Sequence, residues 1–244
     1  MGGFTTRLIS LLRLIFDFPA FRYSLRYSDA FSMLQEAFVL APGERMMKMA
    51  VGFVVGNNIR GDYLEFGVSG GQGITSVFHF AQRYNLKSMR FYGFDSFQGL
   101  PEITGVDANG YCPFSKGQYA CDVNTFKKGI SRNGVDINRV AIIPGWFGEV
   151  LNEETKKTLP IRKAAIIVVD CDLYESSIPV LNFITDYVQD GTVLIFDDWF
   201  AFRGNPNRGE QRAFREWLRN NPDIKATEFH KYGHGGNSFI LHRN

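Results

Sequence analysis

Residues 164–176 read AAIIVVDCDLYES, and residues 192–200 read TVLIFDDWF. Each stretch begins with a short run of apolar and β-branched residues, which is typical of a strand, and then turns acidic. Neighbouring strands of a parallel sheet end at the same edge, where ligands bind in folds of this kind. The two stretches therefore predict two strands whose carboxyl ends bring aspartates together.

From about residue 61 the chain alternates short runs of this kind with longer amphipathic stretches. The alternation is typical of a doubly wound α/β fold with a mostly parallel sheet, here of seven strands. A Gly-rich turn at residues 233–236 joins the last two runs, which we expect to form an antiparallel pair at the sheet edge. The other predicted strands are 62–68, 89–95, 139–145, 225–230 and 238–244, and the predicted crossover helices are 73–84, 122–130 and 176–188.

Residues 1–60 show helical spacing of apolar residues and no strand signal. We interpret them as a helical cap and oligomerisation region, and residues 61–244 as the α/β domain. The apolar run Leu8–Phe16 is broken by Arg13 and is far shorter than the roughly 20 residues that a membrane span needs. We expect an amphipathic helix that covers the domain or a partner subunit, with peripheral membrane contact as the alternative.

The composition of the chain limits the classes of molecule that it is expected to bind. The 27 Lys and Arg residues nearly balance 25 Asp and Glu residues, and a net charge of +2 gives no basis for a nucleic-acid footprint. The three cysteines include no C-x-x-C pair, so they indicate neither a disulfide framework nor a zinc cluster. We expect a cytoplasmic homo-oligomer that acts on a small molecule.

The first motif is YLEFGVSGGQG, residues 63–73, where a strand runs into a glycine cluster and then a helix. Glycines let the backbone approach a ligand closely, as Gly67 and Gly71 would here. The spacing matches neither a Walker A loop nor the dinucleotide fingerprint. Glu65 before the first glycine would repel a pyrophosphate and suit an ammonium group, which favours S-adenosylmethionine. The alternative is a turn that serves packing only.

The second motif is GFDSFQGLPE, residues 93–102. It places Asp95 at the end of the next strand, with Ser96 beside it. A carboxylate at this point can accept hydrogen bonds from both hydroxyls of a ribose, so the motif supports an adenosine cofactor. The alternative is that Asp95 only caps the following turn.

The third motif is the acidic set. Four carboxylates in one crevice repel one another unless protons or a hard cation neutralise them, and an oxygen-only set suits Mg²⁺. The sequence therefore predicts a magnesium site. The alternative is ordinary strand-end carboxylates that face solvent or pair with Arg203, Arg208 or Arg212. The four candidate ligands are Asp170, Asp172, Asp197 and Asp198.

Together with IPGWFGEVL, residues 143–151, these motifs resemble the macrocin O-methyltransferase family over about Asp62 to Trp199. The resemblance implies a Rossmann-like methyltransferase fold, S-adenosylmethionine, Mg²⁺ and methylation of a sugar hydroxyl in natural-product biosynthesis. Residues 203–214 depart from the family pattern because they are longer and more basic, so the family's macrolide substrate is not carried over.

The resemblance also assigns roles. It implies that Trp146 lies near the adenosine or the site wall, and that Tyr174 and Glu175 shape the site. It places cofactor contacts at Glu65, Gly67, Ser69 and Asp95, and metal ligation at Asp197 and Asp198 with one or both of Asp170 and Asp172.

We therefore predict an S-adenosylmethionine- and Mg²⁺-dependent O-methyltransferase acting on a sugar or glycosylated small molecule. The base would be Asp170 or Asp172, whichever does not bind the metal, with His230 and His234 as outside candidates. Arg208 and Glu210 would contact the substrate or only begin a helix. The alternatives are a catechol-type O-methyltransferase, a nicotinamide-dependent dehydrogenase and a non-catalytic nucleotide-binding module. Residues 99–129 would form a lid or an insertion beside the site.

Overall fold

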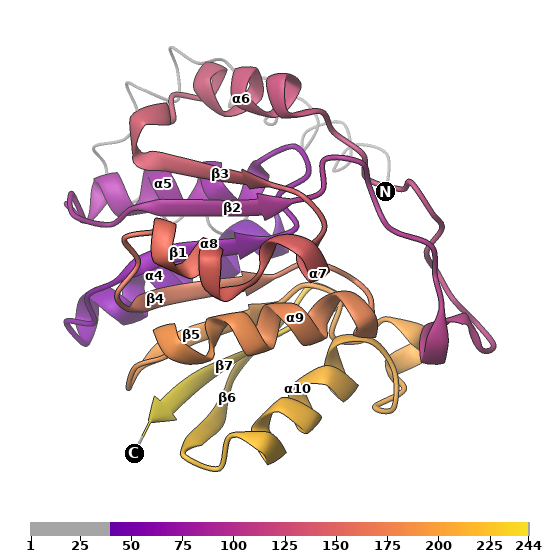
Figure 1. The fold of residues 1–244 in the computed structure, drawn as a ribbon. Helices are drawn as coiled ribbons and strands as arrows, with labels where there is room; N and C mark the ends of the chain where they lie inside the picture. The colour runs from indigo at the N-terminus through magenta and orange to yellow at the C-terminus, as the bar shows by residue number, and fades with distance from the viewer. Residues whose placement is uncertain (1–39, 244) are drawn as a thin grey trace, which may run out of the picture. The chain divides into compact units, whose positions relative to one another are not determined.

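A seven-stranded sheet forms the centre of the protein, as the computed structural model of residues 40–243 shows (Figure 1). Its order is β3-β2-β1-β4-β5-β7-β6. The first five strands are parallel, and β7 runs antiparallel to both β5 and β6. The predicted fold class is confirmed, including the antiparallel C-terminal pair. The strands are β1 (Asp62–Phe66), β2 (Phe91–Asp95), β3 (Val140–Pro144), β4 (Ala164–Val169), β5 (Thr192–Phe196), β6 (Ile224–Tyr232) and β7 (Gly236–Arg243).

Helices cover both faces of the sheet. Buried side chains of α4, α5 and α6 pack on one face, and those of α9 and α10 pack on the other. The three predicted crossover helices are present as α5, α6 and α9, and the helical spacing of residues 46–55 corresponds to α4. The helices are α4 (Pro42–Gly56), α5 (Gln72–Arg83), α6 (Val123–Arg132), α7 (Phe147–Val150), α8 (Glu153–Thr158), α9 (Tyr174–Ile184) and α10 (Gly209–Asn220), with 3₁₀ turns at Gly105–Ala108, Ile137–Arg139, Thr185–Tyr187 and Phe202–Gly204.

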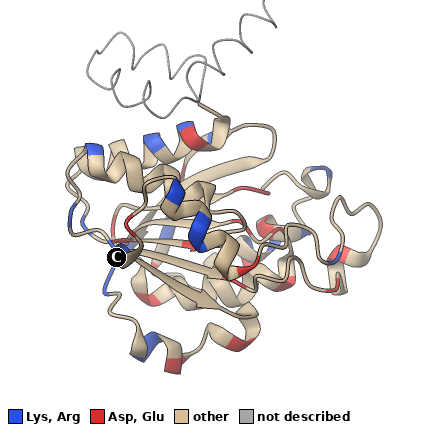
Figure 2. Ribbon diagram, turned by 90° about the horizontal axis from the view of Figure 1, so that it is seen from above, with Lys and Arg blue, Asp and Glu red and all other residues tan. Residues whose placement is uncertain are grey.

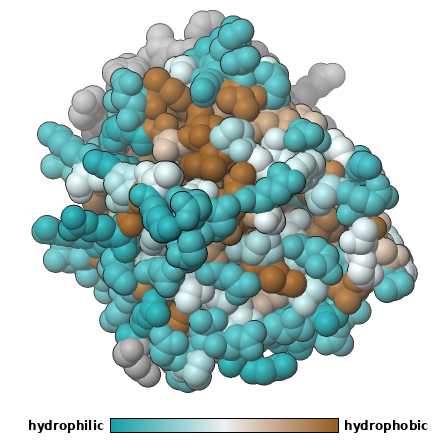
Figure 3. All heavy atoms as spheres, in the orientation of Figure 1, coloured by the Kyte–Doolittle hydropathy of each residue, from teal (hydrophilic) through white to brown (hydrophobic). Residues whose placement is uncertain are grey.

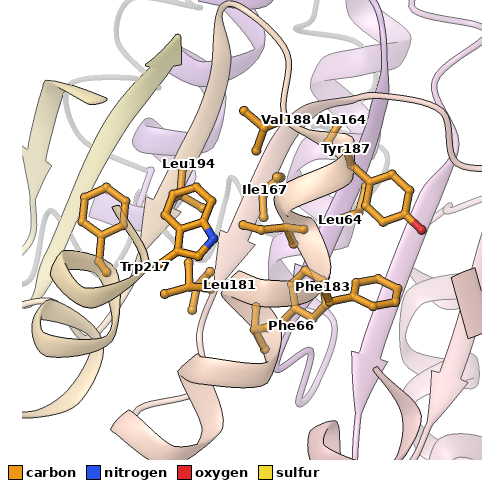
Figure 4. Packing of buried hydrophobic residues seen from close by; sticks show 14 of the residues in the cluster. Leu64, Phe66, Ala164, Ile167, Leu181, Phe183, Tyr187, Val188, Leu194 and Trp217 are labelled. Carbon is orange, nitrogen blue, oxygen red and sulfur yellow. The ribbon is translucent and has the colours of Figure 1, made fainter. Parts of the chain in front are cut away.

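Alternation along the strands divides the core in two, because successive side chains of a strand point to opposite faces. In β1, Leu64 and Phe66 pack under α9, whereas Tyr63 packs under α5. Figure 4 shows the first of these clusters, in which Trp217 of α10 lies beside Leu181 of α9. Aromatic rings fill much of this layer, so many of the 23 Phe residues of the chain serve the core.

Met46–Asn244 forms one compact unit. The face of Figure 1 is mostly hydrophilic, with apolar atoms gathered near its upper centre (Figure 3), and charges of both signs are interspersed over the helices (Figure 2). No helix between residues 40 and 243 is long and apolar enough to cross a membrane. The predicted amphipathic helix at Leu8–Phe16 lies outside the described residues, so the cap and oligomerisation role of residues 1–60 stays a prediction.

The sheet order places a switch point between β1 and β4, since the crossovers leave these two neighbours in opposite directions. Ligands bind outside the carboxyl ends of strands at such a point. The long segment between β2 and α6 leaves the sheet at this same edge (Figure 1). The fold therefore brings the glycine loop, the acidic strand ends and this segment to one place.

Candidate active site

The glycine loop after β1 is shaped by close backbone approach. Gly67 has φ +89°, and a Cβ there would lie 1.7 Å from the carbonyl oxygen of Asp170. A Cβ at Gly73 would lie 2.3 Å from the Glu65 carboxylate. Only glycine fits at these two positions, because any side chain would collide with the end of β4 or with the buried acid. The loop is thereby held against the strand that carries the first acidic pair.

Asp95 ties this loop to the end of β2. Its Oδ2 accepts backbone N–H bonds from Val68 at 2.9 Å and Ser69 at 3.0 Å. Its Oδ1 accepts the N–H of Phe97 at 2.7 Å. A carboxylate has about four acceptor positions, so capacity remains for a ligand hydroxyl. Asp95 therefore does what the turn-cap alternative requires and can still receive a ribose.

Glu65 lies beneath the loop. It is 3 % exposed and accepts a hydrogen bond from the Tyr63 hydroxyl at 2.7 Å. Burial, reinforced by the charge of Asp95, raises the pKa of Glu65 to about 8, which the Tyr63 bond only partly offsets. Its contact with the cofactor ammonium group stays a prediction, because Glu65 is not among the residues that line the cavity. Gly71 is not among them either: it precedes α5, where its missing Cβ admits Ile130.

A cavity of about 550 Å³ opens at this edge of the sheet. One side is the glycine loop and Asp95, and the other side is the acidic strand ends. The segment between β2 and α6 adds both polar and apolar side chains to the lining. The predicted site residues that line the cavity are Gly67, Ser69, Asp95, Ser96, Trp146, Asp170, Asp172, Glu175, Asp197 and Asp198; residues of the long segment that join them include Leu100, Glu102, Thr104, Gln118 and Tyr119.

Three of the four predicted metal ligands converge closely. Carboxylate oxygens of Asp170, Asp172 and Asp198 all lie within 4.8 Å of one another. Asp197 lines the same cavity but lies outside this group, and its Oδ1 accepts a hydrogen bond from the Tyr232 hydroxyl at 2.9 Å. The parallel pairing of Val169 with Phe196 explains the meeting of the two acidic pairs, because it aligns the ends of β4 and β5.

The electrostatics of the acidic cluster favour a cation. Burial and repulsion from Asp197 and Asp198 raise the pKa of Asp170 well above its ordinary value. Burial and the neighbouring Asp198 raise the pKa of Asp172 to about 9, and burial raises that of Asp198 to about 6. Asp172 also has φ +63°, an uncommon conformation for a residue other than glycine. Oxygen donors this close suit a hard divalent ion, which would relieve the repulsion.

Glu210 supports the cluster from behind. It is 1 % exposed, and its Oε2 accepts the backbone N–H of Asp198 at 3.1 Å. Burial and the four aspartates raise its pKa well above the ordinary value. It does not line the cavity, so the structure places it next to a candidate ligand and not at the substrate.

Tyr174 and Arg208 also lie outside the cavity lining. The Tyr174 hydroxyl donates to Glu216 at 2.6 Å, which directs the side chain toward α10. The Arg208 guanidinium donates to the main-chain oxygens of Asp107 and Tyr111 at 2.5 and 2.7 Å. Asp107 and Tyr232 were not found by sequence reasoning, because their partners lie many positions away and no local motif marks them.

Comparisons with known proteins identify the family. A family model described as macrocin-O-methyltransferase (TylF) matches residues 32–227. The chain belongs to this family. Among curated members, the mycinamicin III 3''-O-methyltransferase of Micromonospora griseorubida is 29% identical over 149 residues, which cover 59% of this chain and 57% of the relative. The demethyldecarbamoylnovobiocin O-methyltransferase of Streptomyces niveus is 28% identical over 160 residues, covering 63% and 58%. This member of the macrocin-O-methyltransferase family thus matches less than two thirds of the length of either relative.

Solved structures share the fold. The O-methyltransferase NovP superposes with a TM-score of 0.67 at 24% identity, over 82% of this chain and 79% of NovP. The calicheamicin methyltransferase CalS11 gives 0.69 at 20% identity, over 97% and 91%. The family resemblance and the fold predicted from the sequence are therefore both confirmed.

Proposed function

We propose that this chain is an S-adenosylmethionine-dependent O-methyltransferase that methylates a hydroxyl of a sugar or glycosylated small molecule and uses Mg²⁺. The observation that carries the proposal is one cavity that joins the glycine loop and Asp95 to three converging aspartates. The curated relatives support it, since their names describe O-methyltransferases, one of them acting at a 3'' position of mycinamicin III.

The cofactor side provides binding and orientation. Asp95 would receive the ribose hydroxyls, and the backbone at Gly67 and Ser69 would face the amino-acid portion. Trp146 lines the cavity and would form its wall near the adenosine. Methyl transfer is an in-line displacement at the sulfonium methyl group, so a site that fixes donor and acceptor close together supplies much of the rate enhancement.

The acidic side would hold the metal. Asp170 belongs to the converging group, and all three other aspartates add to the rise in its pKa that burial causes. We assign the cation to Asp170 and Asp198 of the converging group. Asp197 lies outside that group but lines the same cavity, and it would contribute the oxygen that does not accept from Tyr232. Bound Mg²⁺ would stabilise negative charge on the acceptor oxygen and make its proton easier to remove.

Asp172 is our candidate for the general base. It lines the cavity, is 4 % exposed, and has a carboxylate oxygen within 4.8 Å of those of Asp170 and Asp198. A carboxylate oxygen there would accept the proton of the acceptor hydroxyl as the methyl group is transferred. The surrounding walls would exclude water, which competes as a methyl acceptor.

The test is a panel of glycosides and catechols incubated with radiolabelled S-adenosylmethionine and Mg²⁺. We expect methylation of a sugar hydroxyl that is lost with a chelator and restored by Mg²⁺. Methylation of catechols alone would contradict the sugar assignment. Full activity in the chelator would contradict the metal, and saturable binding of NAD⁺ with no binding of S-adenosylmethionine would overturn the enzyme class.

A further inference from the structure

Asp107 joins the starts of two helices through one buried carboxylate. It lies in the 3₁₀ turn Gly105–Ala108 of the segment between β2 and α6, and it is 1 % exposed. Its Oδ2 accepts the N–H of Tyr174 at 2.6 Å, and its Oδ1 accepts the N–H of Gly209 at 3.0 Å. Tyr174 begins α9 and Gly209 begins α10. The first N–H groups of a helix have no partner within the helix, so one side chain here satisfies two helix ends.

Both helices lead directly to the acidic cluster. Tyr174 follows Asp172 by two positions. Gly209 precedes Glu210, whose carboxylate accepts the N–H of Asp198. Asp107 is therefore connected to Asp172 through the start of α9 and to Asp198 through the start of α10. These two aspartates come from different strands and lie side by side in the cluster.

Arg208 fixes the position of Asp107. Its guanidinium donates to the Asp107 and Tyr111 main-chain oxygens, and its Nε lies 3.8 Å from Asp107 Oδ1. The guanidinium carbon also lies 4.4 Å from the centre of the Phe202 ring. The Arg208 side chain is only 10 % exposed. A guanidinium bound in this way is part of the framework and is not directed at a ligand in the cavity.

The same segment forms a wall of the cavity. Leu100 and Thr104 line it before Asp107, and Gln118 and Tyr119 line it after Asp107. The Leu100 N–H donates to the Gln118 oxygen at 2.9 Å, which closes the base of the segment. Asp107 consequently attaches the cavity wall to the starts of α9 and α10, each of which follows an acidic strand end.

We propose that Asp107, held by Arg208, is a positioning residue that sets the separation of the two acidic pairs and couples the cavity wall to metal binding. The proposal rests on the proposed function for its metal, but not on the identity of the acceptor. A carboxylate that only capped a helix would stabilise that helix and leave distant ligand sites unchanged.

The test measures Mn²⁺ binding by electron paramagnetic resonance and S-adenosylmethionine binding by calorimetry in the full chain, for the wild type and Asp107→Ala. We expect Mn²⁺ affinity to fall about tenfold, as is common for residues that orient metal ligands, while cofactor affinity stays within about twofold. The matched control is Asp122→Ala. Asp122 also caps with two bonds, to the N–H groups of Asn124 and Thr125, but at the exposed start of one helix, α6. We expect that control to leave both affinities unchanged.

A second variant, Arg208→Met, leaves both hydrogen bonds of the Asp107 carboxylate in place. It therefore tests the proposal even if Asp107→Ala fails to fold. We expect weaker Mn²⁺ binding than in the wild type and faster proteolysis within residues 99–121. Folded variants of both residues with wild-type Mn²⁺ affinity would overturn the proposal, as would an equal loss of cofactor affinity. Absence of Mn²⁺ binding to the wild type would instead overturn the proposed metal itself.

Discussion

The two sides of the cavity are built differently. On the cofactor side, Asp95 makes its loop bonds to residues 26 and 27 positions away or within its own turn, and glycines supply the shape. On the acidic side, Asp107 reaches across 67 and 102 positions, and Glu210 supports Asp198 from another element. The first side is held by backbone N–H groups and glycines at the ends of two neighbouring strands, whereas the second depends on buried carboxylates supplied by other elements of the fold. Substitutions should therefore separate cofactor binding from metal binding.

The largest effect is expected for Asp170→Asn. Removing this carboxylate from the proposed metal ligands should lower methyl transfer by about 10³-fold, the order associated with loss of a positioned charge in a catalytic site. Binding of S-adenosylmethionine should change by less than about threefold, since the glycine loop and Asp95 remain. Initial rates and calorimetry on the same preparation provide the check. A parallel loss of cofactor binding would show that the two sides are not separable.

The converse change is Asp95→Asn on the cofactor side. The amide can accept on one oxygen only, so the bonds to Val68, Ser69 and Phe97 cannot all persist. Loss of charged hydrogen bonds of this kind costs about 1.5–3 kcal/mol, which corresponds to roughly 10- to 100-fold in cofactor affinity. Equilibrium binding should show this loss, whereas Mn²⁺ affinity should stay at the wild-type value. Weakened Mn²⁺ binding would break the distinction between the two sides.

A smaller effect is expected at Glu210. Glu210→Ala removes the acceptor for the Asp198 N–H and should weaken Mn²⁺ binding by about tenfold. Glu210→Gln retains an amide oxygen for that bond and should recover most of the affinity. Titrations of the two variants provide a matched pair. Equal affinities in both would mean that the bond does not position Asp198.

The smallest effect concerns pH and stability. The folded-state pKa of Asp172 is about 9, and its ordinary value is 3.8, because burial and Asp198 disfavour ionisation. Between these values the folded protein binds more protons than the unfolded protein, so stability falls as pH rises through the window. In the presence of a chelator, the melting temperature should drop on the order of 5 °C from pH 6 to pH 8.5. Adding Mg²⁺ should raise the melting temperature more at pH 8.5 than at pH 6. An equal drop in Asp172→Asn would assign the pH dependence to other groups.

The parts of the site that could be predicted from the sequence differ between the two sides of the cavity in the same way. The apolar runs 164–169 and 192–196 predict their strands because buried strands of this kind have a local composition. The glycine loop and the aspartates after β4 and β5 are equally local, so the cavity could be anticipated. Contacts between elements that lie far apart in the sequence could not be predicted. Arg208 reads as a candidate ligand for an anion until the fold brings Asp107 beside it, and Glu210 reads as the start of a helix until Asp198 lies against it.

One measurement tests the central claim most directly: paramagnetic relaxation of the methyl protons of bound S-adenosylmethionine by Mn²⁺. The account predicts one Mn²⁺ ion per chain and strong relaxation of the methyl resonance in the wild type. It also predicts loss of that relaxation in Asp170→Asn while the cofactor stays bound. Stoichiometric Mn²⁺ that leaves the methyl protons unaffected would place the ion away from the methyl donor and contradict the account.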